Sequence, residues 1–576
     1  MRFFCLFLSI AFAASNIVLG QVTFQEMGWE LHFRDLDPSA GVAIVDLDED
    51  GISEIITTSF DGPDRLYKWA DTIYIERGAL YGLTQDADEH HSICLTDIDK
   101  DRRPDFFITG DPVFVNHGHL YINNGHPPFP DMAEDYNLDQ VQEMGSSFFQ
   151  FTPTSELAVL CGGRFMVRQG DTFIDITQGS GLESIVYVHE PLFFDIDGDY
   201  DDDLVIVGNW EDYPARMYRN NGDTTWTDIS TNTNQGGFPV GQGVIFGDID
   251  NDGDFDIYIV SGFQTNTMWE NDGTGFFTNV TAQSNTGVGG YSRGTCFADF
   301  DNDTDIDLYI NRSTDYNMLF LNNGNGVFTD YSYEAGTIHY YNGGGCASGD
   351  FNNDGNLDIF AVNCDNQRNL AYINQNQDSS FLKIRMMGDY PNYMAFGAIV
   401  ELYGITEDPP DTVFIGKRQV ASLTAVYSVN DPVVHFGTGD YTELRVVAVF
   451  NSLYTVDVAG IAPGRTIVIY EHTTSIDYVD SEIPSSHNII NAYPNPFNSS
   501  VRISINDKPS SYYTLAIYDI LGRLIKFDNA VSDPSGKLEY IWDGSDHFSN
   551  PVSSGIFFIR VAGKNLRAGE KVTLLK

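Results

Sequence analysis

The stretch GDIDNDGDFDIYIV, residues 247–260, carries an aspartate at every second position from 248 to 256. Like charges packed this closely repel one another, so a folded chain needs something that neutralises them. A solvated acidic loop is the ordinary explanation for a run of charge, but the spacing here is that of a cage of oxygen atoms. Positions 1, 3, 5 and 9 of one tight loop are filled by Asp248, Asp250, Asp252 and Asp256, with Gly253 at position 6 and the carbonyl of residue 254 at position 7. The pattern predicts a site for a hard cation.

Calcium suits this loop better than magnesium does. Calcium takes about six to eight oxygen ligands in flexible geometry, whereas magnesium requires a nearly octahedral site and keeps several waters. The loop begins like an EF-hand, but that motif needs a glutamate at position 12 and two flanking helices. Position 12 here is Ile259, which lies in an alternating apolar run typical of a strand. We therefore expect a calcium loop between two strands of a hairpin.

The loop belongs to a repeated set. First aspartates at 46, 97, 195, 248, 299 and 350 are separated by 51, 98, 53, 51 and 51 residues, so the interval of 98 spans two periods. The hidden copy is FFQFTPTSELAVL, in which Glu156 takes position 9 and Phe148, Gln150 and Thr152 replace the other ligands. The six loops predicted to bind calcium offer Asp46, Asp48, Asp50 and Glu54; Asp97, Asp99, Asp101 and Asp105; Asp195, Asp197, Asp199 and Asp203; Asp248, Asp250, Asp252 and Asp256; Asp299, Asp301, Asp303 and Asp307; and Asp350, Asn352, Asp354 and Asp358.

A period near 50 residues indicates a repeat fold, and the content of each unit identifies which one. An apolar strand precedes each loop, and three strands follow it, for example those containing DIYIV, MWENDGTG and FFTNV. Seven units of four strands predict a seven-bladed β-propeller. The last unit lacks a fourth strand, and VTFQEMGWEL, residues 22–31, reads like the fourth strands of the other units. We therefore expect the N-terminal segment to complete the blade that holds Asp350.

On these loops and their spacing, residues 21–380 resemble the FG-GAP or VCBS repeats of extracellular bacterial proteins, which are similar to the calcium-binding blades of integrin α-subunits. The resemblance implies a β-propeller with up to six structural Ca²⁺ sites. Arg102, Tyr200 and Thr304 replace the loop glycine, and Asn352 replaces a carboxylate. Those sites are expected to bind calcium more weakly, and the loop 97–105 most weakly of all.

Two further β-rich regions follow the repeats. Residues 381–473 contain FGAIVELYG and VVHFGTGDYTEL, and they resemble the ASPIC/UnbV domain through Gly397, Ala398, His435, Phe436, Gly437 and Gly439. We expect His435 to be a packed turn residue rather than a catalyst, because no partner motif accompanies it. After a linker at 474–490, residues 491–576 resemble the C-terminal type A sorting domain of type IX secretion. The predicted fold class is all-β, with the propeller followed by two small β-sandwich-like domains.

Residues 1–20 have the basic start, apolar core and small residues of a signal peptide, and no later stretch is apolar enough to predict a transmembrane span. Together with the sorting-domain resemblance, this predicts a secreted or extracellular protein, released or attached to the outer cell surface, with the secretion machinery as a partner. The net charge of −51 argues against nucleic acid and anionic membranes. Cys94, Cys296 and Cys346 are interpreted as buried side chains, and no disulfide framework is indicated.

The sequence contains no H-E-x-x-H, G-x-S-x-G, P-loop or C-x-x-C motif, and no catalytic residue or organic cofactor is predicted. His90 and His91 form an adjacent pair without spaced partners, which we expect in a solvated turn. Two functions remain. The first is a calcium-stiffened scaffold for binding or adhesion to an extracellular glycan or protein, and the alternative is a secreted lyase or glycoside hydrolase acting on polysaccharides. The missing catalytic signature favours the scaffold.

Overall fold

A computed structural model of the protein describes residues 22–70, 73–83, 89–110, 118–139, 144–152, 155–185, 188–208, 213–262, 264–376, 379–407, 410–472, 476–479, 490–506, 512–519, 524–531, 533, 537–545, 551–563 and 566–575. The expected signal peptide and most of the expected linker lie outside these residues. Residues up to 481 form one compact unit and those from 482 onward form a second.

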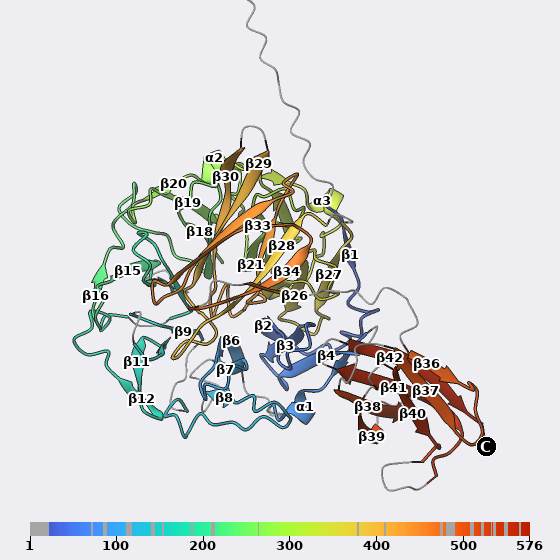
Figure 1. Cartoon of the computed structure of the whole chain (residues 1–576). Helices are drawn as coiled ribbons and strands as arrows, with labels where there is room; N and C mark the ends of the chain where they lie inside the picture. The colour runs from blue at the N-terminus through green and yellow to red at the C-terminus, as the bar shows by residue number, and fades with distance from the viewer. Residues whose placement is uncertain are drawn as a thin grey trace, which may run out of the picture. The chain divides into compact units, whose positions relative to one another are not determined.

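In the described part of the chain, strands β1–β27 form seven sheets arranged around a common centre (Figure 1). Their inner strands contact one another in a closed cycle, β2, β6, β9, β13, β17, β21, β25 and back to β2, which defines a ring. The sheets are β2 (Ser39–Val45), β3 (Glu54–Ser59), β4 (Arg65–Ala70) and β5 (Ile73–Glu76); β6 (His90–Thr96), β7 (Asp105–Gly110) and β8 (His119–Tyr121); β9 (Ser146–Phe149), β10 (Ala158–Cys161), β11 (Arg164–Gln169) and β12 (Thr172–Asp175); β13 (Glu190–Phe194), β14 (Asp203–Val207), β15 (Arg216–Asn220) and β16 (Trp226–Asp228); β17 (Gly243–Gly247), β18 (Asp256–Val260), β19 (Thr267–Asn271) and β20 (Phe277–Asn279); β21 (Ser292–Ala298), β22 (Asp307–Arg312), β23 (Met318–Leu321) and β24 (Thr329–Asp330); and β25 (Gly343–Gly349), β26 (Asp358–Asn363), β27 (Leu370–Asn374) and β1 (Phe24–Glu26).

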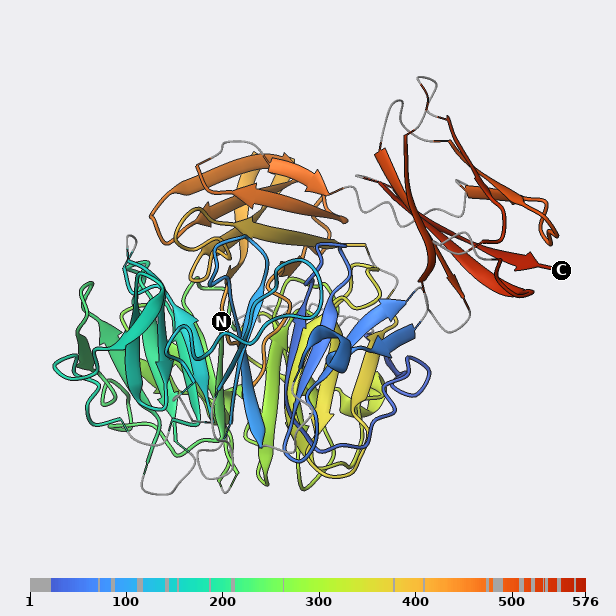
Figure 2. The same ribbon diagram turned by 90° about the horizontal axis from the view of Figure 1, so that it is seen from below.

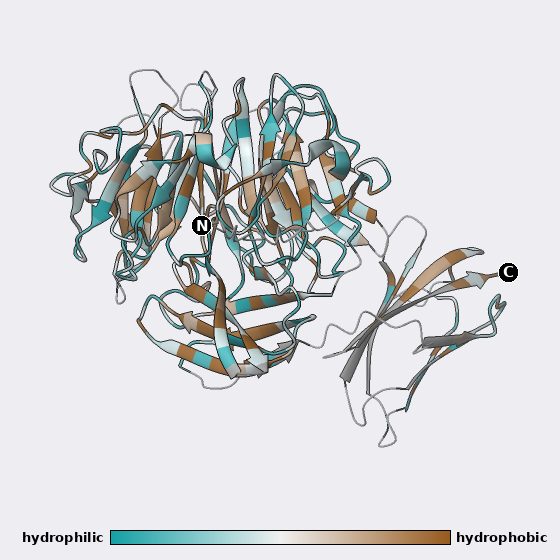
Figure 3. Cartoon of the chain, turned by 90° about the horizontal axis from the view of Figure 1, so that it is seen from above, coloured by the Kyte–Doolittle hydropathy of each residue, from teal (hydrophilic) through white to brown (hydrophobic). Residues whose placement is uncertain are grey.

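The strands of the ring carry bands of apolar and polar residues, brown and teal in Figure 3. The first two strands of each sheet are almost wholly buried, because each sheet packs against two neighbours, whereas the outer strands bury one face. Cys94, Cys296 and Cys346 are buried free thiols, as expected.

The N-terminal strand closes the ring, as the sequence predicts. Phe24 and Glu26 of β1 pair with Asn374 and Tyr372 of β27, in the sheet whose β25 leads into Asp350. An ion pair between Glu26 and Arg368, 2.5 Å from Oε2 to Nη2, joins the two ends of the ring. The closing sheet is therefore shared between residues far apart in the sequence.

The three helices among the described residues are single turns, α1 (Gly78–Tyr81), α2 (Thr281–Ser284) and α3 (Ser332–Ala335). None of the helices in the described residues has the length and apolar character needed to cross a membrane.

Residues 381–479, called the cap below, lie over one face of the ring (Figure 2). They form two four-stranded sheets, one of β31 (Val434–Gly437), β28 (Phe381–Met387), β34 (Arg465–Tyr470) and β35 (Ile476–Val479), and one of β30 (Pro410–Gln419), β29 (Ile399–Glu407), β32 (Leu444–Val449) and β33 (Thr455–Ile461). The strand β35 falls inside the range predicted as linker. The polar residues before 476 favour a linker, but the short run IDYV pairs with β34 and belongs to the cap sheet.

One segment of the cap, residues 421–431, enters the ring and is called the plug below. Its backbone bonds to three inner strands, with Val429 N donating to Val42 O (2.9 Å), Leu95 N to Ser422 O (3.1 Å) and Asp431 N to Ser348 O (3.1 Å). The inner strands leave room for it with glycines, since a Cβ at Gly243 would lie 1.8 Å from a methyl carbon of Val426. The centre of the ring is thus filled by the plug rather than by the strands alone.

The second unit, residues 482–576, has two sheets of its own. One consists of β36 (Ile490–Tyr493), β37 (Val501–Asn506) and β40 (Lys537–Trp542), and the other of β39 (Leu524–Val531), β38 (Tyr512–Asp519), β41 (Gly555–Gly563) and β42 (Leu566–Leu574). Trp542, Phe557 and Val572 are among the residues of a separate apolar core between them.

Candidate metal centre

The acidic loops all lie at the end of the ring where the inner strands finish, called the loop face below. In the loop 248–256, Asp248 accepts hydrogen bonds from the backbone N–H groups of Asp252 (3.1 Å) and Gly253 (3.3 Å). Asp256 accepts from Ile249 N (3.0 Å) and Asn271 N (2.8 Å). Oxygens of Asp248, Asp250 and Asp256 come within 4.8 Å of one another. The backbone therefore brings together three of the four predicted ligands of this loop, Asp252 not being among them.

The same backbone bonds shape all six predicted loops. In each, the first aspartate accepts from the N–H groups at positions 5 and 6. Position 6 has a positive φ in every loop, including the three that lack glycine, with φ of 75° at Arg102, 67° at Tyr200 and 94° at Thr304. The substitutions noted in the sequence thus preserve the loop shape, at the cost of a left-handed backbone in residues that seldom adopt it.

In these loops, burial and neighbouring carboxylates disfavour the ionised form of the aspartates. Burial raises the pKa of Asp248 to about 7, and the charges of Asp252 and Asp250 add to the rise. Burial likewise raises the pKa of Asp303 to about 9, helped by Asp299 and Asp301. A bound cation would remove this penalty, because an opposite charge favours the ionised carboxylate.

Buried oxygens without partners give the most direct test of whether a cation fits. Asp197, Asp250 and Asp301 stand at position 3 of three loops, and each has a buried side-chain oxygen without a hydrogen-bond partner. Buried carboxylate oxygens are rarely left in this state. All-oxygen ligands and several carboxylates are the donor set that calcium prefers, so the residues present fit the ion.

Four of the predicted loops have a basic side chain within 4.0 Å of a predicted ligand. Arg103 Nη1 lies 2.5 Å from Asp101 Oδ2 in the loop 97–105, and Arg219 Nη1 lies 4.0 Å from Asp197 Oδ2 in the loop 195–203. In the loop 46–54, the ammonium of Lys68 lies 2.8 Å from Asp48 Oδ2 and also contacts Glu54. In the loop 350–358, Lys383 of the cap lies 2.7 Å from Asp350 Oδ2. Neither lysine lies in a loop motif, so the spacing of the aspartates gives no sign of either.

The sheet of β9–β12 has the degenerate loop. Glu156 accepts from Lys100 Nζ (2.9 Å) and from the hydroxyl of Tyr390, so its charge is met by side chains from the preceding loop and the cap. Gln150 bonds to Ser155 O and to Asn392. That this segment binds no cation stays a prediction.

The histidines correct one expectation and support another. His90 and His91 are buried at the start of β6, not in a solvated turn, and His90 Nδ1 lies 2.8 Å from Asp64 Oδ2. Both histidines belong to an inner strand whose seven residues are all buried, which their polarity does not indicate. His435 is packed, as expected, with Nε2 donating to Gly355 O at 2.9 Å, and burial lowers its pKa to about 3.

The cap covers the loop face through contacts to the loops themselves. Arg385 Nη2 lies 3.0 Å from Asp46 Oδ2, Gln419 Nε2 donates to Asp202 Oδ1 at 2.7 Å, and Gly437 N donates to Asp299 Oδ2 at 3.0 Å. The opposite end of the ring, where the inner strands begin, is called the far face below.

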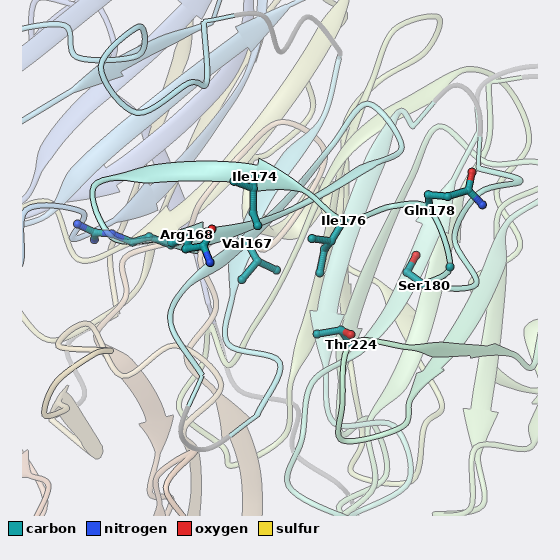
Figure 4. A pocket seen from close by; sticks show the side chains of 9 residues that line it. Val167, Arg168, Ile174, Ile176, Gln178, Ser180 and Thr224 are labelled. Atoms are coloured by element: carbon teal, nitrogen blue, oxygen red, sulfur yellow. The ribbon is translucent and has the colours of Figure 1, made fainter.

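Two pockets lie elsewhere on the ring. The first, of about 350 Å³, is lined by Val167, Arg168, Ile174, Ile176, Gln178, Ser180 and Thr224, among others (Figure 4). Its one charged group, Arg168, already donates to Ile98 O (2.5 Å) and Gly170 O (2.9 Å). The second, of about 590 Å³, lies on the far face, and its lining includes Gln235, Phe238, Gln264, Trp269 and Asn279.

Two family models match parts of the chain. A model described as FG-GAP-like repeat matches residues 195–259, 248–310 and 299–361, and one described as secretion system C-terminal sorting domain matches residues 491–574. No curated protein matches the chain. The resemblance of residues 381–473 to the ASPIC/UnbV domain stays a prediction.

Solved structures offer weak similarities. The extracellular domain of the hybrid two component system BT3049 from B. thetaiotaomicron is 8% identical at a TM-score of 0.39, over 93% of this chain and 55% of that one, so the chain spans about half of its length. PorZ, a surface component of the type IX secretion system of Porphyromonas gingivalis, is 12% identical at 0.18, over 94% and 82% of the two chains. Sqt1 of Saccharomyces cerevisiae is 10% identical at 0.35, over 62% and 99%.

The matched repeats coincide with four of the acidic-loop sheets, those of β13, β17, β21 and β25, and the sorting domain coincides with the second unit. A sorting domain of this kind implies interaction with the secretion machinery. The chain thus carries FG-GAP-like repeats in a β-propeller-like ring and a type IX secretion C-terminal sorting domain, which marks it as a secreted, cell-surface protein.

Proposed function

We propose that the ring is a seven-bladed, calcium-binding β-propeller that serves as a rigid scaffold and binds an extracellular glycan or protein on its far face. The observation that carries the calcium assignment is the set of partnerless buried oxygens at Asp197, Asp250 and Asp301. Bound calcium supplies charge neutralisation and cross-links the ends of each loop. Binding to the folded loops in preference to the unfolded chain would stabilise the ring.

The ligand assignment rests on which face is free. The cap covers the loop face, so the turns of the far face are the exposed ones, and exposed loops on a rigid scaffold are where binding residues concentrate. The pocket of about 590 Å³ on that face has the size of a small-ligand site. Its exposed amides, Gln235 and Gln264, offer the donors and acceptors that sugar hydroxyls require.

Calcium content tests the first part. The secreted protein, dialysed against micromolar calcium and analysed for metal, should retain several equivalents, and excess chelator should remove them and lower Tm. A protein that carries no calcium and has the same Tm in chelator would contradict the assignment.

A glycan-binding screen tests the second part. Gln235→Ala and Gln264→Ala should weaken binding of any glycan that the wild type retains, whereas Gln178→Ala, an exposed amide in the other pocket, should not. Analysis of the same mixtures for new reducing ends tests the polysaccharide-degrading alternative. Steady release of oligosaccharides would favour the enzyme, and binding that is equal in all three variants would remove the pocket from the proposal.

A further inference from the structure

The ammonium group of Lys68, on the neighbouring strand β4, lies among the carboxylates of the loop 46–54. Lys68 Nζ lies 2.8 Å from Asp48 Oδ2 and 3.7 Å from Asp50 Oδ2, and it contacts Glu54 Oε1 as well. These are positions 3, 5 and 9 of the loop, three of the four side chains predicted to hold calcium. A lysine side chain is an ammonium at neutral pH, and the three carboxylates around Lys68 favour this charged form.

The register of the sheets shows that this lysine is a substitution at a defined place. In each acidic-loop sheet, an aromatic residue of the third strand pairs with the residue that follows position 9, as Tyr67 does with Ile55 and Trp269 with Ile257. The residue after that aromatic side chain is Lys68, Ile122, Arg219, Glu270, Leu321 or Ile373 in the six sheets. The loop 248–256 therefore has a glutamate where the loop 46–54 has a lysine. Arg219 reaches one ligand, Asp197, at 4.0 Å and leaves its Oδ1 without a partner, whereas Lys68 contacts three ligands.

The ninth position changes together with the third strand. In five loops it is an aspartate whose second oxygen accepts from the backbone N–H of an asparagine, as Asp256 does from Asn271. In the loop 46–54 it is Glu54, whose longer side chain reaches Lys68 instead, and the asparagine is replaced by Trp69. Both differences, the longer side chain of Glu54 and the loss of the asparagine, favour Lys68 over a backbone N–H as the partner of the second oxygen of Glu54.

The remaining ligand is also neutralised. Asp46, at position 1, receives Arg385 of the cap at 3.0 Å. Lys68 and Arg385 together bring the charge of one calcium ion to the four carboxylates. Asp48, at position 3, is exposed and accepts from Lys68 Nζ, whereas Asp250 has a buried oxygen without a partner.

We infer that the ammonium of Lys68 replaces calcium in the loop 46–54, so that this loop is permanently neutralised and binds no metal while the loops without such a lysine do. The inference rests on the proposed function for the other loops, but the role of Lys68 does not. Because β2 and β3 lie beside the sheet that β1 completes, the closing seam of the ring would keep its shape when calcium is scarce.

The test uses the full secreted chain and two exchanges at equivalent positions. Lys68→Met removes the charge and keeps the length of the side chain, so the loop should gain a site and the protein should bind one more calcium ion than the wild type. Lys68→Arg, the charge-retaining control, should bind the same number as the wild type. Glu270→Lys places an ammonium beside Asp250 and should remove one calcium ion from the total.

A second measurement separates the inference from the calcium proposal. In chelator, Lys68→Met should lower Tm by several degrees, since three carboxylates lose their counter-ion, and Lys68→Arg should restore most of it. A wild type without calcium would contradict the proposed function, and the Tm pair would still test Lys68. An unchanged calcium count in Lys68→Met, or equal Tm values for the two variants in chelator, would overturn the inference.

Discussion

The loops 46–54 and 248–256 share one backbone and differ in how their charge is met. Each first aspartate accepts the same two backbone N–H groups, and position 6 is a glycine with positive φ in both. In the first loop a lysine lies among the carboxylates, whereas in the second Asp250 has a partnerless buried oxygen and Glu270 adds negative charge. The comparison shows that the shape of a loop and the neutralisation of its charge are separate properties, because the backbone sets the first and a side chain on a neighbouring strand contributes to the second.

Removal of calcium should have the largest effect on stability, and it should destabilise some sheets of the ring more than others. Each occupied site contributes about 2.7 kcal/mol when free calcium is about 100 times its dissociation constant, so stripping several sites should lower Tm strongly. Hydrogen exchange in chelator should rise in β17, β18, β21 and β22, while β2 and β3 stay protected. Addition of excess calcium should reverse the change. Equal loss of protection in all of these strands would break the comparison between the two loops.

Substitution of the aspartate at position 3 should change the stability of the protein in opposite directions in the two loops. Burial, with the charge of Asp252 next, raises the pKa of Asp250 to about 6, so in chelator Asp250→Asn should stabilise the fold by roughly 1 kcal/mol after allowance for partial exposure. With calcium present the same change should cost affinity at one site.

Asp48→Asn is the control, because Asp48 is a half-exposed partner of Lys68. It should destabilise the protein by less than about 1 kcal/mol in either buffer and leave the calcium count unchanged. Urea unfolding curves with and without calcium measure both variants. Stabilisation by Asp48→Asn in chelator, or loss of stability in Asp250→Asn there, would remove the distinction.

The smallest expected effect concerns backbone strain within the loops that are proposed to bind calcium. Thr304 and Gly253 both stand at position 6 with φ of 94°, a conformation that a β-branched residue seldom adopts. Thr304→Gly should raise the free energy of unfolding by about 0.5 to 1 kcal/mol, since relief of strain exceeds the entropy of the added glycine. Gly253→Thr should have the opposite sign, and a destabilised Thr304→Gly would show that the loop is not strained.

Repetition made most of the ring predictable. Each loop carries its own shape in the sequence, because the first aspartate and the N–H groups it accepts lie within six residues of one another. Pairing of the N-terminal strand with the last sheet followed from the strand that was missing there. The cap boundary was less clear, since nothing periodic marks β35.

Interactions between distant segments were not predictable in the same way. Lys68 follows Glu54 by 14 residues and lies on another strand, so only an alignment of the third strands, where YKWA stands in place of the Asn-ending pattern, could have revealed it. His90 is buried because Asp64 bonds to its ring, a partner that composition does not show. The plug has no repeat and no motif, and its fit depends on glycines in strands far away.

The plug also sets an order of assembly. Val42 N donates to Ser428 Oγ across a separation of 386 residues, and β2, β6 and β25 all bond to the plug backbone. Contacts between residues so far apart form late, because a long chain must be closed before they contribute. The earliest strands to be synthesised therefore wait for one of the last segments of their unit before their inner surface is covered. The packing of the ring is therefore complete only once the plug, near the C-terminal end of the unit, is in place, although the first strands of the ring are N-terminal.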